Sequence, residues 1–189
     1  MAYVELAEVK AYLGIGDTDA DDSLIADLIS NAQGIIEAYT DRKFEAETAT
    51  YYFTNQSIEG RWLYLWGYDL LTVTTLTNGD DTELSSATYR LEPRNTSPKW
   101  AIRLNEDYDW VFGDSDSEIS IAGTWGYTAT APYDIKQACL RLTAFLYRQK
   151  DTSADVDRPL VTGDGVTIMP SSFPQDIKSI LDKYKRRIA

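Results

Sequence analysis

Four stretches of the chain repeat apolar residues every three to four positions, which is the spacing of one face of an α-helix. They cover residues 6–13, about 22–40, 132–149 and about 174–188. The third stretch also has apolar residues on its opposite side, so that helix needs two packing partners. The sequence therefore predicts two helices near each end of the chain.

The pattern changes between about residues 47 and 128, where Thr, Tyr, Trp and Val alternate with polar residues and turn signals. Six segments are predicted as strands: 48–53, 61–66, 70–77, 87–93, 99–105 and 117–125. We therefore expect an α+β protein that forms one domain, residues 1–189. In this interpretation a four-helix core, 1–44 and 131–189, carries an antiparallel β insertion at about 45–130.

The acidic stretch DTDADDS, residues 17–23, has aspartates at alternating positions, as a calcium loop does. Counted from Asp17, the sixth position of such a loop needs glycine and the twelfth needs glutamate, but Asp22 and Leu28 occupy them. The stretch is better explained as the start of a helix, with Asp21 or Asp22 as the N-cap that accepts bonds from first-turn amides. We expect no metal there.

Composition excludes several classes of chemistry. The chain has no histidine and one cysteine, so histidine-dependent catalytic triads and the common zinc sites are absent. Neither glycine-rich phosphate-binding motif is present, and the formal net charge of −12 argues against sequence-specific DNA binding. No apolar run is long enough for a membrane span, and the first residues do not form a signal peptide. We expect no enzymatic activity, cofactor or membrane.

Three groups of residues are candidate contact surfaces. Apolar or aromatic positions without an assigned partner lie on the second side of the third helix and on one side of a strand: Leu140, Ala144, Tyr147, Trp62, Tyr64 and Trp66. They contact either the chain's own strands or a second subunit. The segment 105–118 is an exposed acidic loop, with Glu106, Asp107, Asp109, Asp114 and Asp116. The last helix combines an apolar stripe with cations: Ile177, Ile180, Leu181, Tyr184, Lys185, Arg186 and Arg187.

Several stretches together resemble the head–tail connector family of long-tailed bacteriophages, also called head-completion or DNA-packaging adaptor proteins. They are VELAEVKAYLGI, DDSLIADLISNAQGIIEAYTDRKF, SSATYRLEP (85–93) and APYDIKQACLRLTAFLYRQKD (131–151). The resemblance covers nearly the whole chain, most clearly residues 4–44 and 131–150, but rests on structural positions and not on a diagnostic motif.

The resemblance implies a mechanical role in the neck of a virion that is assembled in the bacterial cytoplasm. Copies, usually twelve, would form a ring below the portal protein, continue the DNA channel and receive a neck, stopper or tail-completion protein. The last helix would then dock on the portal, the acidic loop would face passing double-stranded DNA, and the unassigned apolar side of the third helix would contact the next subunit. The alternative for the last helix is that its apolar stripe packs on the chain's own helices.

Two alternatives remain open, and only the first of them, a carbohydrate-binding module, belongs to another class. The tryptophans and tyrosines in the strand region are also typical of a carbohydrate-binding module, although such modules are usually all-β. Another neck or tail-completion protein of the same particle would look similar, and a phage-derived gene-transfer particle would use the same kind of part. A ring of about twelve copies in a native mass spectrum would distinguish the adaptor from the carbohydrate-binding module.

Overall fold

The computed structural model of the chain describes residues 2–16, 19–114, 118–150, 160–161, 167–168 and 174–186. The chain divides into two compact units. The helical unit consists of Met1–Asp41 and Pro132–Ala189, and the β unit consists of Arg42–Ala131.

The helical unit contains the four described helices. They are α1 (Leu6–Leu13), α2 (Asp22–Thr40), α3 (Tyr133–Gln149) and α4 (Gln175–Leu181). Two short antiparallel strands, β8 (Leu160–Val161) and β9 (Thr167–Ile168), come between α3 and α4 in the sequence. The first three helices confirm the prediction from apolar periodicity, whereas α4 is shorter than predicted because turns begin at Asp182.

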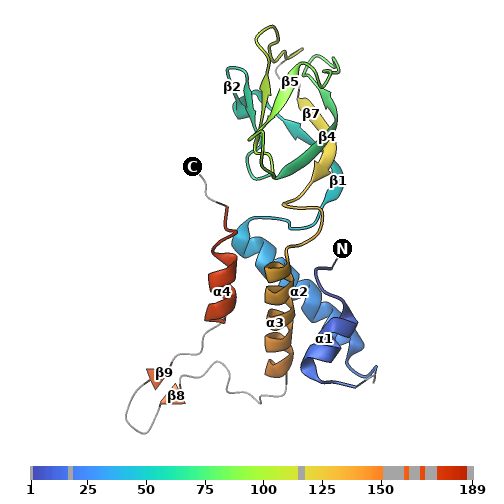
Figure 1. The fold of residues 1–189 in the computed structure, drawn as a ribbon, viewed down its shortest axis with the longest axis vertical. Coiled ribbons are helices and arrows are strands. Elements are labelled where there is room, and N and C mark those ends of the chain that lie inside the picture. Colours follow the sequence, from blue (N-terminus) through green and yellow to red (C-terminus); the bar gives the residue numbers. More distant parts are fainter. Residues whose placement is uncertain are drawn as a thin grey trace. The chain divides into compact units, whose positions relative to one another are not determined.

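Local sequence explains where these helices begin and end. The amide of Glu5 donates to the Glu8 carboxylate at 2.8 Å in a capping box that starts α1. Gly14 adopts the left-handed conformation that ends α1, with φ of 71°. One side of α2 is buried through Ile25, Ile29 and Ile36. In Figure 1, α3 lies beside α2, and it contacts α1 and α4 as well.

The β unit is built from two antiparallel sheets (Figure 1). The three-stranded sheet has the order β1 (Glu47–Phe53), β7 (Ile119–Trp125), β4 (Leu70–Thr77). The four-stranded sheet has the order β2 (Ile58–Glu59), β3 (Trp62–Tyr64), β6 (Ala101–Leu104), β5 (Tyr89–Glu92). A short 3₁₀ helix, η1 (Asn55–Ser57), precedes β2. All six predicted strands are confirmed, and among the described strands of this unit β2 alone was not predicted.

The two sheets bury a shared apolar core. Its buried members come from both sheets and from Leu65, which follows β3: Phe53, Leu63, Leu65, Leu70, Leu76, Ile102, Ile119, Ile121 and Trp125. The core strands approach closely at Gly123 on β7, where a Cβ would lie 2.2 Å from the carbonyl oxygen of Thr72. Only glycine fits this position without moving the backbone of β4.

The predicted fold class, a four-helix core with a β insertion, is wrong in its central claim. The chain is α+β, but residues 42–131 form a compact unit around their own core. Most of the largest fully buried side chains, from Phe44 to Ile121, belong to this unit and not to the helices. The physical reason is that each sheet has one apolar side, and the two sheets cover each other. The position of the strands between helices in chain order did not reveal this.

Candidate interaction surfaces

The outward side of the four-stranded sheet carries a group of aromatic rings. Trp62 and Tyr64 on β3 point away from the core because Leu63 between them is fully buried. The ring of Trp100 lies 6.1 Å from that of Trp62 and 6.0 Å from that of Tyr64, with both ring pairs within 6° of parallel. The Trp66 ring lies 5.2 Å from Tyr64. We call Trp62, Tyr64, Trp66 and Trp100 the aromatic face.

The predicted residues Trp62, Tyr64 and Trp66 therefore do come together, with Trp62 and Tyr64 half-buried and Trp66 exposed. The side chain of Trp66 is 57% exposed and that of Trp100 is 48% exposed. Trp100 was absent from the prediction because the segment 99–105 gave no register relative to β3. Large exposed aromatic groups of this kind are typical of interaction surfaces.

Two arginines continue this surface across the sheet. Trp62 on β3 is paired with Arg103 on β6, and Arg103 is paired with Arg90 on β5. Directly paired residues share a side of the sheet, so the three form one outward row. The guanidinium carbon of Arg103 lies 5.4 Å from the centroid of the Trp62 ring, within cation–π range. Neither arginine could be predicted as part of this surface from the sequence, since only strand register places them beside the tryptophans.

Arg90 and Arg103 place two positive charges opposite each other. Both side chains are exposed, and neither forms an ion pair with a carboxylate within the described part of the chain. Like charges directly opposite each other destabilise an antiparallel pair. An anionic group bound across the two arginines would relieve that repulsion.

The acidic loop, which we define as residues 105–114, connects β6 toward β7 and is fixed near its end by Asn78. The Asn78 side-chain oxygen accepts from the amides of Gly79 at 3.2 Å and Val111 at 3.0 Å. Its amide nitrogen donates to the carbonyl oxygen of Asp109 at 3.4 Å. Asn78 is only 3% exposed, so its side chain depends on these three bonds and not on water for partners.

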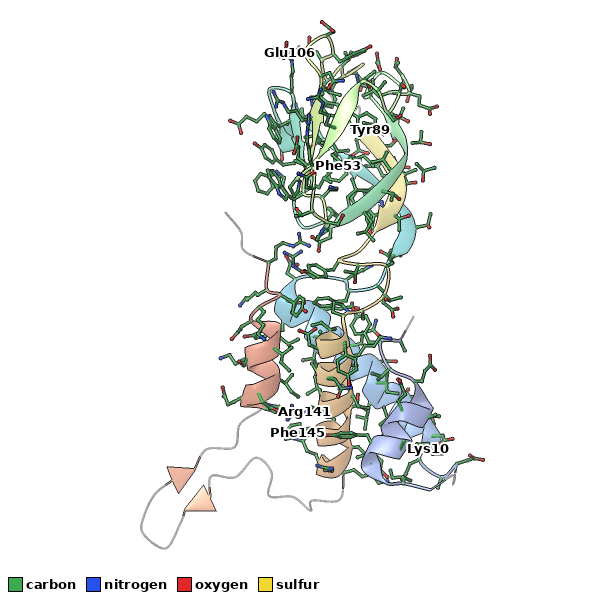
Figure 2. All side chains as sticks on the ribbon, in the orientation of Figure 1. Lys10, Phe53, Tyr89, Glu106, Arg141 and Phe145 are labelled. Carbon is green, nitrogen blue, oxygen red and sulfur yellow. The ribbon has the colours of Figure 1, made fainter. Side chains whose placement is uncertain are left out.

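The acidic residues that the sequence assigned to this loop are exposed where the structure describes them: Glu106, Asp107, Asp109 and Asp114. Figure 2 shows Glu106 at the margin of the β unit. Asp116 lies outside the described residues. Two apolar side chains of the loop are also exposed, Tyr108 by 42% and Val111 by 44%. The loop thus presents carboxylates and apolar surface together.

The apolar stripe of α4 is covered by the chain's own helical unit. Ile177 and Leu181 are 1% and 0% exposed, and Ile180 is half-buried. The hydroxyl of Tyr184 donates to both carboxylate oxygens of Asp134 on α3. The expectation that this stripe is available to another protein therefore requires correction, because α2 and α3 already occupy it.

The basic residues beyond α4 are partly engaged as well. The amide of Arg186 donates to the carbonyl oxygen of Thr40 at 2.9 Å, and its Nε donates to that of Asp41 at 3.0 Å. The Lys185 Nζ lies 5.1 Å from the centroid of the Tyr39 ring. Arg187 lies outside the described residues. The exposed cations that α4 and its end offer to a partner are Lys178, Lys183 and Lys185.

The second side of α3 also packs within the helical unit. Leu140 is 9% exposed and Ala144 is 2% exposed. The hydroxyl of Tyr147 donates to the Asp21 carboxylate at 2.6 Å. These three residues were candidates for a subunit contact, but the neighbouring helices of the same chain cover or bind them.

Asp21 is an ion-pair partner and not a helix cap through its side chain. Its carboxylate accepts from Lys150 Nζ at 2.7 Å and from Tyr147, and these two bonds lower the pKa of Asp21. No first-turn amide of α2 donates to it. Within the described ranges no group of three or more side chains is arranged to hold a metal, and Asp17 lies outside them.

A pocket of about 180 Å³ lies beside α3, lined by residues that include Tyr12, Phe145, Arg148 and Ile177. Figure 2 labels Phe145 and Arg141 on this helix. Arg141 and Asp176 both line the pocket and form an ion pair with each other, so neither charge is left for a ligand. The volume is below the roughly 300–1,000 Å³ of typical small-molecule sites.

The exposed aromatic face, with the arginines beside it, has the composition of surfaces that contact other proteins. Residues 3–187 match the model of the head completion protein family, and the chain belongs to that family. The resemblance noted from the sequence is thereby confirmed.

No curated protein matches the chain. Among the described helices, none is long and apolar enough to cross a membrane.

The fold is similar to that of chains in solved gene transfer agent (GTA) particles. A chain from the neck of an empty GTA particle, computed with C6 symmetry, is 20% identical with a TM-score of 0.68, covering 99% of this chain and 92% of that one. A chain from the virion of a native GTA particle is 20% identical with a TM-score of 0.67 and the same coverage. A chain from the neck of a native GTA particle, computed with C12 symmetry, is 17% identical with a TM-score of 0.62, covering 100% and 96%.

Proposed function

We propose that the protein is a structural, non-enzymatic component of the neck of a phage-like particle. The observation that carries this proposal is the match of the head completion family to residues 3–187. The similarity of fold to chains from GTA necks supports the same position in the particle. In this role the chain is assembled in the host cytoplasm and remains at the head–tail interface of the virion.

The proposed arrangement is a ring, with twelve copies as the expected number. The C6 and C12 symmetries of the GTA necks support a cyclic assembly. Repeating a head-to-tail contact between identical copies produces such a ring when the rotation closes. The net charge of −12 supports passage of double-stranded DNA through the ring without tight binding, because carboxylates repel phosphates.

The proposed partners are the portal protein on the head side and a neck, stopper or tail-completion protein on the other side. The exposed lysines of α4 and its end, Lys178, Lys183 and Lys185, are the part of the predicted docking helix that a portal can still contact. The buried residues Ile177 and Leu181 hold this helix in place and take no direct part in the contact.

Deleting the gene for this chain tests this role. We expect DNA-filled heads without attached tails, and restoration of infectious or transducing particles when the wild-type chain is supplied. Cryo-electron microscopy of particles containing a tagged chain should place the tag at the neck with cyclic symmetry. Tailed particles from the deletion strain, or a tag found at the tail tip, would refute the proposal and return attention to a carbohydrate-binding role for the aromatic face.

A further inference from the structure

We propose that the acidic loop of one copy binds the aromatic face and its two arginines on the next copy. This inference rests on the proposed ring and names the contact that builds it. The two surfaces belong to the same β unit but consist of different residues. The acidic loop begins where β6 of the aromatic face's own sheet ends, and farther along it is fixed to Asn78 and Gly79 after β4.

The aromatic face has the composition of an interface centre. Tryptophan, tyrosine and arginine are the residues that dominate binding energy at protein interfaces. Here the rings of Trp62, Tyr64, Trp66 and Trp100 lie together, and Arg103 lies over the Trp62 ring. Trp66 and Trp100 are about half exposed although they are large and apolar. A protein partner would remove this surface from water, which is favourable by area.

Charge identifies the partner as an acidic segment. Arg90 and Arg103 are opposite each other without a carboxylate partner in the described part of the chain. The acidic loop offers exposed carboxylates at Glu106, Asp107 and Asp109, with exposed apolar side chains beside them. An acidic and apolar loop thus complements a basic and aromatic face.

The chemistry favours this occupant over the alternatives. Duplex DNA would provide phosphates for the arginines but no apolar group for four aromatic rings, since its bases are stacked inside. The loop supplies both. Because loop and face are different surfaces, the contact is heterologous and can close into a ring. The acidic loop is then a subunit contact and not a channel lining, which changes the role that the sequence suggested.

Paired charge reversals test the contact in the purified full-length chain. The face variant is Arg90→Glu with Arg103→Glu, and the loop variant is Asp107→Arg with Asp109→Arg. The control, Lys178→Glu with Lys183→Glu, changes the net charge as much as the face variant does but alters exposed residues of another unit. Self-association is measured by sedimentation velocity over a concentration series at low and high salt.

Each reversal alone should weaken self-association by at least about tenfold, because it places like charges across the contact. The control should remain within about threefold of the wild type. The two variants mixed in equal amounts should associate again as alternating copies, since each face then meets a loop of opposite charge. A single chain that carries both reversals should also associate.

Three results would overturn the contact. They are a wild-type chain that stays monomeric at every concentration, reversals that associate as well as the wild type, and a mixture that fails to recover. If tagged chains are nevertheless found at the neck, the proposed function stands and another surface builds the ring. Quenching of tryptophan fluorescence by duplex DNA or an oligosaccharide, lost with Arg103→Glu, would assign the face to that ligand instead.

Discussion

The hydroxyl of Tyr184 donates to both carboxylate oxygens of Asp134, at 2.7 and 2.8 Å. This pair joins the residues that follow α4 to the first turn of α3, 50 positions earlier in the chain. Ile177 and Leu181 are buried on the same helix. The C-terminal segment is therefore part of what stabilises the helical unit, and its exposed lysines are presented on a fixed support.

Replacing Tyr184 with phenylalanine should lower the free energy of unfolding by about 1 kcal/mol. The change removes the hydrogen bond of a half-buried hydroxyl, and a typical intramolecular hydrogen bond contributes about 0.5–1.5 kcal/mol. Urea unfolding followed by circular dichroism measures the loss. Tyr133→Phe is the matched control, because Tyr133 is 77% exposed and should give no change. Equal effects of the two substitutions would contradict the role of the Asp134 bond.

Truncation after Ser172 should destabilise the helical unit by about 3–6 kcal/mol. Ile177 and Leu181 are almost fully buried, and burial of each large apolar side chain contributes about 1.5–3 kcal/mol. Thermal and urea unfolding of the truncated chain measure this. Removal of residues 187–189 alone serves as the control. An unchanged unfolding midpoint after truncation at Ser172 would mean that α4 is dispensable for the fold and would favour a docking role for its stripe.

Much of the secondary structure was predictable because it depends on local spacing. Residues 22–40 and 70–77 show their helix and strand periods directly, and the structure has α2 and β4 at those positions. The packing partners of each element were harder to predict. Leu140 and Ile177 are apolar whether they contact their own chain or another, so only the fold shows that both are covered internally.

The candidate surfaces, too, were predictable only where they depend on local spacing. Trp62, Tyr64 and Trp66 could be found because residues two apart on one strand share a side. Trp100 and Arg103 join them only through the pairing of β3 with β6, and a single sequence does not show that register. Likewise, the role of Asn78 in holding Val111 depends on a contact across 33 positions.

Asp21→Asn should lower stability at neutral pH, and the difference from the wild type should disappear in acid. Hydrogen bonds from Lys150 and then Tyr147 lower the pKa of Asp21 below its ordinary value of 3.8. A lowered pKa stabilises the fold above that ordinary value, and the contribution is lost as pH falls through the folded-state pKa. Urea midpoints across this range measure it. Asp19→Asn is the control, and a constant difference down to the lowest pH would contradict the pair.

Cys139 should resist thiol reagents until the chain unfolds. The thiol is fully buried on α3, and burial raises its pKa from 9.0 to about 12. The raised pKa also means that its stabilising contribution is present below pH 9.0 and is lost as pH rises toward about 12. Reaction with a chromogenic disulfide should be complete in guanidinium and negligible in buffer. Rapid labelling of the folded chain would show that α3 opens locally.

Asn78→Ala should loosen the acidic loop and lower the free energy of unfolding by about 2–3 kcal/mol. The substitution removes the acceptor of the buried Gly79 amide and of the part-buried Val111 amide, and a buried donor that loses its partner costs about 1–3 kcal/mol. The donor to Asp109 is lost as well. Urea unfolding gives the stability change, and limited proteolysis should show faster cleavage within residues 105–114. Asn55→Ala is the control, because Asn55 is exposed.

If the acidic loop binds the aromatic face of the next copy, Asn78→Ala should also weaken self-association while the folded β unit persists, because a loose loop must be ordered on binding. Stability lost without any change in cleavage of the loop would mean that Asn78 supports the turn after β4 and does not position the loop.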